Sequence, residues 1–230
     1  MTPDTDKENP KEIKIGFSLL AVLLIAVTAL FIFGWLAEEV FEGQTEKFDA
    51  FVRFSVHQFS TPTVTHLMQA FSVLGSIAVM TPVVFLAICG LIYFHRPRAA
   101  ALLAIAMVGA GGLDIGLKYA FHRARPVSFF GTSPGSYSFP SGHALASLCF
   151  YGSLAAILTA RVRGRTAKIC IWIIAAFLVA MIGLSRIYLG VHYPSDVIAG
   201  YCVAAAWVGM VVFLDRALGK RRAKSSRVNS

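Results

Sequence analysis

The chain has 230 residues, of which 57% are hydrophobic and only 14% are charged, and its mean hydropathy is +0.68. Because soluble domains carry about 25% charged residues, this composition excludes an ordinary soluble protein. The apolar residues fall in blocks of roughly 18 to 25, which is the length that a helix needs to cross a bilayer. The sequence therefore predicts an all-α integral membrane protein.

In chain order, the apolar blocks predict six membrane-spanning helices at residues 15–36, 67–94, 99–119, 143–160, 169–184 and 197–214. Gly75 and Pro82 are expected to interrupt the second span, since proline removes a helix hydrogen bond. Between the first two spans, residues 48–66 carry phenylalanines spaced among polar residues, which predicts an amphipathic helix in the membrane interface. A polar tail at 1–14 and a basic tail at 216–230 flank this six-span domain at 15–215.

Basic residues indicate the orientation of the spans. Six spans place both termini on one side, and most of the 21 lysines and arginines fall on that side. Because cytoplasmic loops carry the excess of Lys and Arg, we expect both termini in the cytoplasm and the protein in the cytoplasmic membrane. The net charge of +9 follows from this topology, so no nucleic-acid partner is expected. The basic residues expected on the periplasmic or extracellular side are Lys47, Arg53, Lys118, Arg123, Arg125 and Arg186.

The first polar segment on that side runs from Lys118 to Pro126. Lys118 and Arg125 are seven residues apart, so they would point in similar directions if the helix continued until Pro126 stopped it. The pair suits an anion, although long basic side chains also reach the interface from helix ends without any ligand. Asp114 lies one helical turn before Lys118 and would either hold the lysine in place or form a plain ion pair.

The second polar segment is Pro140-Ser141-Gly142-His143, directly before an apolar block. Ser141 is a natural N-cap, and Gly142 lets a ligand approach the backbone. The free N–H groups of a helix N-terminus attract anions, and His143 in the first turn is suited to moving a proton. Taken alone, this segment is explained better by an ordinary Ser-capped helix. The Gly- and Ser-rich residues 131–138 upstream are expected to form a loop that moves over a pocket.

The third polar segment runs from Ser185 to Asp196. Pro194 fits the first turn of a new helix, which places Asp196 inside that turn and His192 just before it, within reach of the carboxylate. A carboxylate on one ring nitrogen leaves the other nitrogen free to attack or to move a proton. Arg186 adds a positive charge suited to an anion. For this segment alone, an ion pair beside an interfacial histidine is an equal alternative.

All three segments fall on the same expected face and together suit phosphoryl transfer. Cations and backbone amides would bind phosphate oxygens, while one histidine attacks phosphorus in line and the other protonates the leaving oxygen. No acidic cluster of the kind that holds Mg²⁺ accompanies them, so the cations are expected to take the role of a metal. The four cysteines lie in separate apolar blocks without metal-ligand spacing, and we expect them to be packing residues.

These segments resemble the motifs of the type 2 phosphatidic acid phosphatase family, which shares them with vanadium-dependent haloperoxidases. The family pattern is Lys-x6-Arg-Pro, then Pro-Ser-Gly-His, then Ser-Arg-x5-His-x3-Asp. The chain matches it without departure between Lys118 and Asp196. The six-span layout resembles the family over nearly the whole length.

The resemblance implies a role for each motif residue. His192 would be the nucleophile that forms a phosphohistidine, Asp196 would orient it, and His143 would protonate the leaving oxygen and then activate water. The residues implied to bind the phosphate are Lys118, Arg125, Ser141, Gly142 and Arg186. The family needs no metal, so no cofactor is expected.

The implied substrate is a lipid phosphate or diphosphate that enters from the outer leaflet. Undecaprenyl diphosphate, phosphatidylglycerophosphate, phosphatidic acid and lipid A phosphates fit the pattern equally well. A phosphate-group transferase using the same phosphohistidine is a close alternative. A non-enzymatic lipid-binding protein or transporter would have no need of both histidines, and six apolar spans argue against a haloperoxidase.

Overall fold

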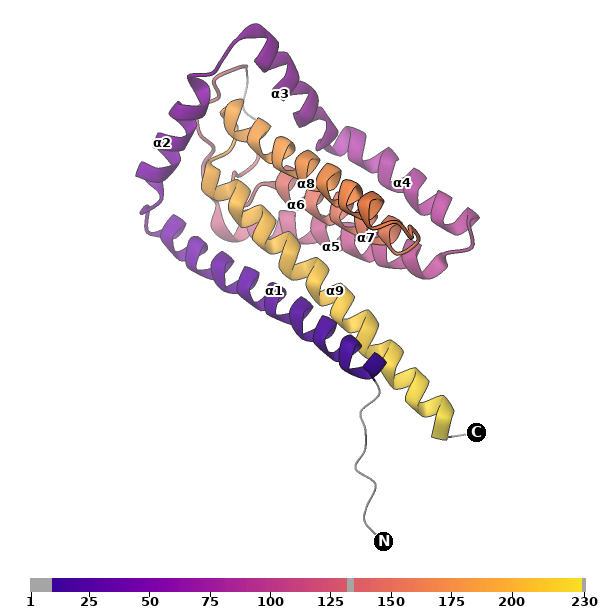
Figure 1. Ribbon diagram of the computed structural model, residues 1–230. Helices are drawn as coiled ribbons and strands as arrows, with labels where there is room; N and C mark the ends of the chain where they lie inside the picture. Colours follow the sequence, from indigo (N-terminus) through magenta and orange to yellow (C-terminus); the bar gives the residue numbers. More distant parts are fainter. Residues whose placement is uncertain (1–9, 132–134, 229–230) are drawn as a thin grey trace.

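A computed structural model describes residues 10–131 and 135–228 of the chain (Figure 1). The first nine residues of the predicted N-terminal tail, the last two of the basic tail and residues 132–134 of the predicted mobile loop lie outside the described residues. Within these ranges every regular element is helical. The elements are α1 (Pro10–Phe41), α2 (Glu46–His57), α3 (Pro62–Leu74), α4 (Ile77–Tyr93), α5 (Pro97–Phe121), α6 (Gly142–Ser147), the π-helical turn η1 (Leu148–Gly152), α7 (Ser153–Thr159), α8 (Arg165–Tyr188) and α9 (Pro194–Val228).

The helices of the described residues have the length and composition of membrane spans. Five qualify individually, in α1, in α5, in the continuous run of α6, η1 and α7, in α8 and in α9. A sixth results if α3 and α4, which are bent by 48° at a short break, form one span. Large apolar side chains such as Phe31 and Val108 are 78% and 77% exposed, as expected where lipid replaces a protein core. The predicted all-α, multi-pass membrane fold is confirmed.

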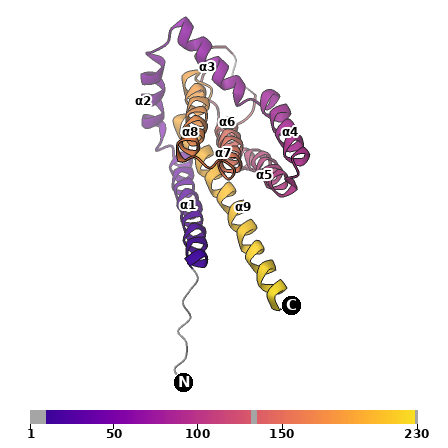
Figure 2. The ribbon, with the colours of Figure 1, turned by 45° about the vertical axis from the view of Figure 1, so that its right-hand side comes forward.

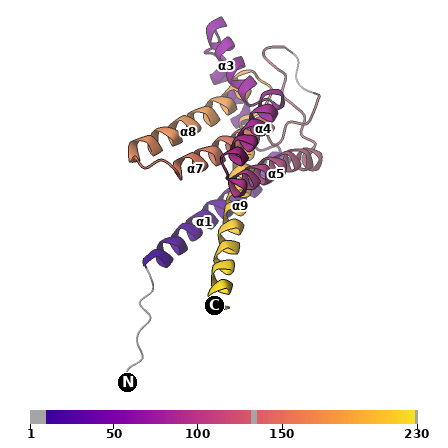
Figure 3. The ribbon, with the colours of Figure 1, turned by 90° about the vertical axis from the view of Figure 1, so that its right-hand side faces the viewer.

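The long helices form a bundle around a small core. Helices α1 and α9 pack along each other (Figure 1), and after a short turn α8 runs back beside α7 (Figure 3). On the other side of the bundle, α3 packs against α8 and α4 packs against α5 (Figure 2). Leu103 of α5, Leu145 of α6 and Ile182 of α8 are fully buried between the helices.

Two local predictions were wrong, at Pro82 and in the amphipathic segment, each for a physical reason. The predicted interruption of the second span at Gly75 is confirmed, whereas α4 continues through Pro82 without a break. Proline is tolerated inside membrane helices, where local adjustments satisfy the freed carbonyl. The amphipathic segment ends at His57, and Pro62 opens a separate helix whose cap is Thr61. Helix α5 ends at Phe121, two residues beyond the predicted end of its span, and His122 after it adopts a left-handed conformation with φ of 49°.

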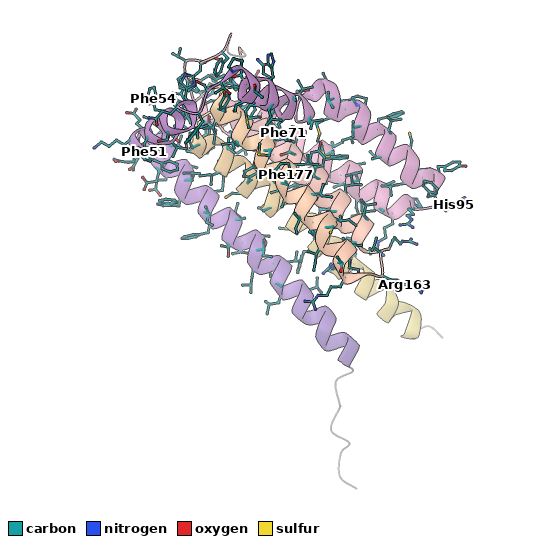
Figure 4. All side chains as sticks on the ribbon, turned by 45° about the horizontal axis from the view of Figure 1, so that its top comes forward. Phe51, Phe54, Phe71, His95, Arg163 and Phe177 are labelled. Atoms are coloured by element: carbon teal, nitrogen blue, oxygen red, sulfur yellow. The ribbon has the colours of Figure 1, made fainter. Side chains whose placement is uncertain are left out.

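The two ends of the bundle differ in chemistry. At one end α2 carries the exposed side chains of Phe51 and Phe54, whereas His95 and Arg163 lie in loops at the opposite end (Figure 4). The start of α1 and the end of α9 lie toward that opposite end as well (Figure 1). The three polar segments meet at the α2 end.

Candidate active site

The candidate site lies where the end of α5, the start of α6 and the turn between α8 and α9 converge. A cavity of about 650 Å³ opens there, and its lining brings together six of the sequence-predicted residues. These residues are Lys118, Arg125, Gly142, His143, Arg186 and His192. Asp196 lies directly behind His192, and Ser141 precedes the first turn of α6.

The turn between α8 and α9 has the predicted geometry. Helix α9 begins at Pro194, and Asp196 in its first turn is fully buried. Its Oδ2 lies 3.3 Å from Nδ1 of His192 and also accepts the backbone N–H of Tyr193 at 2.9 Å. One carboxylate oxygen therefore fixes both the imidazole and the backbone that carries it.

Arg125 determines which nitrogen of His192 carries the proton. Its Nη1 lies 2.9 Å from Nε2 of His192 and donates to the carbonyl of Val191 at 2.8 Å. A guanidinium can only donate, so Nε2 must accept with its lone pair and the proton must sit on Nδ1, facing Asp196. This tautomer leaves a nucleophilic lone pair on the nitrogen that faces the cation.

Burial keeps the His192 imidazole neutral. The residue is 1% exposed, and this burial lowers its pKa to about 4, although the hydrogen bond and the charge of Asp196 raise it in part. Burial also lowers the pKa of the Arg125 guanidinium, which stays charged because the normal value is so high. A neutral imidazole beside a poorly hydrated cation is suited to attack on an anionic phosphorus centre.

The start of α6 lies against α5. Asp114 Oδ1 would stand 2.5 Å from a Cβ at position 142, so only glycine fits there without a shift. Ser141 occupies the N-cap position, but its side chain forms no capping hydrogen bond, which corrects the prediction. Its Oγ is buried and has no hydrogen-bond partner among the described residues. A buried hydroxyl without a partner costs free energy unless a ligand satisfies it.

The remaining cations are held by neighbouring side chains. Lys118 donates to Asp114 Oδ2 at 2.8 Å, which confirms the predicted shared face. Arg186 lies in the last turn of α8, where its Nη1 donates to Ser72 Oγ of α3 and its Nε has no partner among the described residues. The helix of Lys118 does not continue to Arg125: α5 ends at Phe121, and Arg125 reaches the cavity from an extended loop.

Apolar side chains line the rest of the cavity. They come from α4 and α5 and include Met80, Val84, Phe85, Met107 and Val108. Phe85 and Val108 are themselves largely exposed on the outer surface of the bundle. The cavity therefore runs from the cationic end of the site to the surface that faces lipid.

The site is bordered by two charged residues, Arg123 and Asp49, that the sequence did not predict as part of it. Arg123 donates to Asp196 Oδ1 at 2.6 Å through Nη1 and to Asp49 Oδ2 at 2.8 Å through Nη2. Asp49 comes from α2 and is 1% exposed. The sequence marked Arg123 only as a basic residue on an unexpected side, and nothing in the spacing connects Asp49 with it.

Comparison with known proteins identifies the family. The sequence model of the PAP2 superfamily matches residues 99–218, a little over half of the chain and all of its three motifs. The chain belongs to the PAP2 superfamily. As a PAP2 protein it is 28% identical over 165 residues to phosphatidylglycerophosphatase B of Bacillus subtilis, covering 71% of this chain and 81% of the relative.

Further relatives extend the PAP2 assignment. The chain is 32% identical over 156 residues to undecaprenyl-diphosphatase of Sulfolobus acidocaldarius, covering 65% of this chain and 69% of that protein. Its fold matches the crystal structure of a transmembrane PAP2 type phosphatidylglycerolphosphate phosphatase from Bacillus subtilis with a TM-score of 0.77. That match has 24% sequence identity and covers 84% of this chain and 96% of the other. The structural match therefore extends beyond residues 99–218, the segment that the family model matches.

Proposed function

We propose that the protein is a membrane lipid phosphatase that transfers a phosphoryl group from a lipid to His192 and then to water. The observation that carries this proposal is the cavity, which joins an apolar passage between α4 and α5 to a cationic end containing His143 and His192. A molecule that fits both parts has a hydrocarbon chain and a phosphate. The presence of both His143 and His192 at the cavity, with Asp196 bonded to His192, supports catalysis rather than binding alone.

In the first step, Nε2 of His192 attacks phosphorus in line with the bond to the lipid oxygen. The N–P bond forms as the P–O bond breaks, and His143 donates its proton to the leaving lipid oxygen. Asp196 accepts the hydrogen bond from Nδ1 and stabilises the positive charge that the imidazole gains. In the second step, His143 takes a proton from water, whose oxygen attacks phosphorus and releases inorganic phosphate and neutral His192.

Lys118, Arg125 and Arg186 bind the phosphate oxygens in this proposal, together with Ser141 and the backbone of Gly142. In the free protein, Nη1 of Arg125 contacts the attacking nitrogen itself at 2.9 Å, as well as the carbonyl of Val191. Substrate binding must therefore move this donor from His192 to a phosphate oxygen. The exchange exposes the lone pair only when an anion is present to replace it.

The substrate class is a lipid phosphate or diphosphate. Relatives are named for phosphatidylglycerophosphate, undecaprenyl diphosphate and the 1-phosphate of lipid A, and each combines a phosphate with long apolar chains. The exposed side chains of Phe85 and Val108 at the mouth of the cavity favour entry sideways from the bilayer. No nucleic-acid partner is proposed.

We also propose that both termini are cytoplasmic and that the site opens on the periplasmic or extracellular side of the cytoplasmic membrane. The support is the distribution of charge. At the end of the bundle opposite the site, Arg96, Arg161 and Arg163 lie in loops, and Arg98 and Arg165 lie in the first turns of α5 and α8. The positive-inside rule favours the cytoplasm for this end. A cysteine-accessibility measurement at positions 96 and 51 tests this orientation.

The experiment that tests the function is phosphate release by detergent-purified protein in EDTA. The panel contains phosphatidic acid, phosphatidylglycerophosphate and undecaprenyl diphosphate, each with wild type and His192→Ala. We expect release by wild type and none by His192→Ala, and the ranking of lipids gives the substrate. Release that persists in His192→Ala contradicts the nucleophile assignment. Loss of lipid phosphate without release of inorganic phosphate indicates the transferase instead.

A further inference from the structure

A buried ionic network connects α2 to the start of α9. Asp49 accepts three hydrogen bonds: from the backbone N–H of Ser195 at 2.9 Å, from Ser195 Oγ at 2.6 Å and from Arg123 at 2.8 Å. The same Ser195 hydroxyl accepts from Nη1 of Arg123 at 2.8 Å. Ser195, the residue that precedes Asp196 in α9, is therefore bound by a carboxylate 146 positions earlier in the chain.

This network fixes the orientation of the Asp196 carboxylate. Arg123 occupies Oδ1 of Asp196 at 2.6 Å, which leaves Oδ2 for His192 Nδ1 and the N–H of Tyr193. The Arg123 guanidinium also stacks on the Tyr193 ring at 4.2 Å from its centroid. With both oxygens engaged, the carboxylate cannot rotate about its last bond without losing hydrogen bonds, and the one to the charged Arg123 guanidinium is of the strong kind.

The charges of the network also matter at His192. Asp49 and Asp196 share one guanidinium, so the three side chains together carry one net negative charge next to the imidazole. Removing the charge of Asp49 would leave Arg123 to neutralise Asp196 alone. The field that stabilises positive charge on His192 would then weaken, and this field acts at short range in a poorly solvated site.

We propose that Asp49 and Arg123 are positioning residues that hold Asp196, and through it His192, in the geometry for in-line attack. The inference rests on the proposed nucleophilic role of His192. It makes α2 a part of the catalytic unit, although α2 lies outside the segment that the PAP2 model matches. Neither residue lines the cavity, so both act on the chemical step and not on substrate binding.

The test compares kcat and KM for dioctanoyl phosphatidic acid in wild type, Asp49→Asn, Arg123→Lys and the double variant. We expect each single variant to lower kcat by about tenfold while KM changes less than about twofold. Because Asp49 and Arg123 belong to one network, the loss of kcat in the double variant should be smaller than the product of the two single losses. Asp215→Asn is the matched control, since Asp215 pairs with Arg98 at the other end of the bundle at 2.9 Å.

The outcomes separate this inference from the proposed function. If wild type and Asp215→Asn release no phosphate from any lipid, the proposed function fails. If they are active and Asp49→Asn and Arg123→Lys retain full kcat, the inference is overturned. If Asp49→Asn does not fold, Arg123→Lys, which keeps a cation between the carboxylates, decides alone. Failure of all the network variants to fold would assign the network a purely structural role and would also overturn the inference.

Discussion

Replacing Asp196 by asparagine tests how the nucleophile is prepared. The carboxylate of Asp196 accepts from three donors: Arg123 Nη1 at 2.6 Å, the Tyr193 N–H at 2.9 Å and His192 Nδ1 at 3.3 Å. An amide has one oxygen and one NH₂ group, so in either orientation it turns a donor toward a donor. The least costly relief is for His192 to move its proton to Nε2, where it meets Arg125 and removes the nucleophilic lone pair.

The expected magnitude follows from the loss of the correct tautomer. An equivalent change in a Ser-His-Asp triad lowers kcat by about 10⁴, and we expect about 10³ to 10⁴ for Asp196→Asn, equal to about 4 to 5 kcal/mol in the barrier. The assay is kcat for dioctanoyl phosphatidic acid at saturation, with Asp215→Asn as the matched carboxamide control. A melting temperature in the same detergent verifies folding. If folded Asp196→Asn retains kcat within about tenfold of wild type, the proposed role of the tautomer is refuted.

Three further predictions concern the cavity, the helix start and pH. Gly142→Ala would bring a Cβ within 2.5 Å of Asp114 Oδ1, so the rate of phosphate release should fall by about 100-fold. The control is Gly112→Ala, whose added Cβ meets no atom within 4 Å and which should remain active in the same assay. Gly111→Leu adds a side chain to the cavity lining. The KM for a long-chain lipid phosphate should rise by about tenfold, while the kcat for a dioctanoyl substrate should not change. Burial lowers the pKa of His192 in the folded protein to about 4, whereas the same side chain in the unfolded chain titrates near its usual value of about 6.5. As the pH falls between these two values, the unfolded chain takes up a proton that the folded protein does not, so the folded protein loses stability. The melting temperature of wild type should therefore drop more between pH 7 and 5 than that of His192→Gln.

The parts of the site that the sequence predicted are those governed by local geometry. Pro194 begins α9 and brings Asp196 next to His192, because a proline start and a separation of one helical turn leave little freedom. Lys118 pairs with Asp114 for the same reason. The meeting of the three polar segments was also predictable, since each borders an apolar span on one side of the membrane.

The parts that sequence did not predict depend on contacts between distant segments. Asp49 lies in an acidic stretch of an amphipathic helix, where its burial against Ser195 has no local signal. Ser141 carries an N-cap sequence, yet its backbone N–H donates to the carbonyl of Asp196 and its Oγ stays unbonded within the described part of the chain. The sequence left open whether the helix of Lys118 continues to Pro126, and the left-handed His122 ends it at Phe121.

The most direct test of the central claim is the trapping of a phosphohistidine on His192. Protein turning over a ³²P-labelled lipid phosphate is quenched in alkaline detergent, which preserves the N–P bond, and the label retained on the chain is measured. We expect wild type to retain label that acid releases, and His192→Ala to retain none. Equal labelling of both proteins, or no label on wild type during steady release of phosphate, would contradict a covalent intermediate on His192.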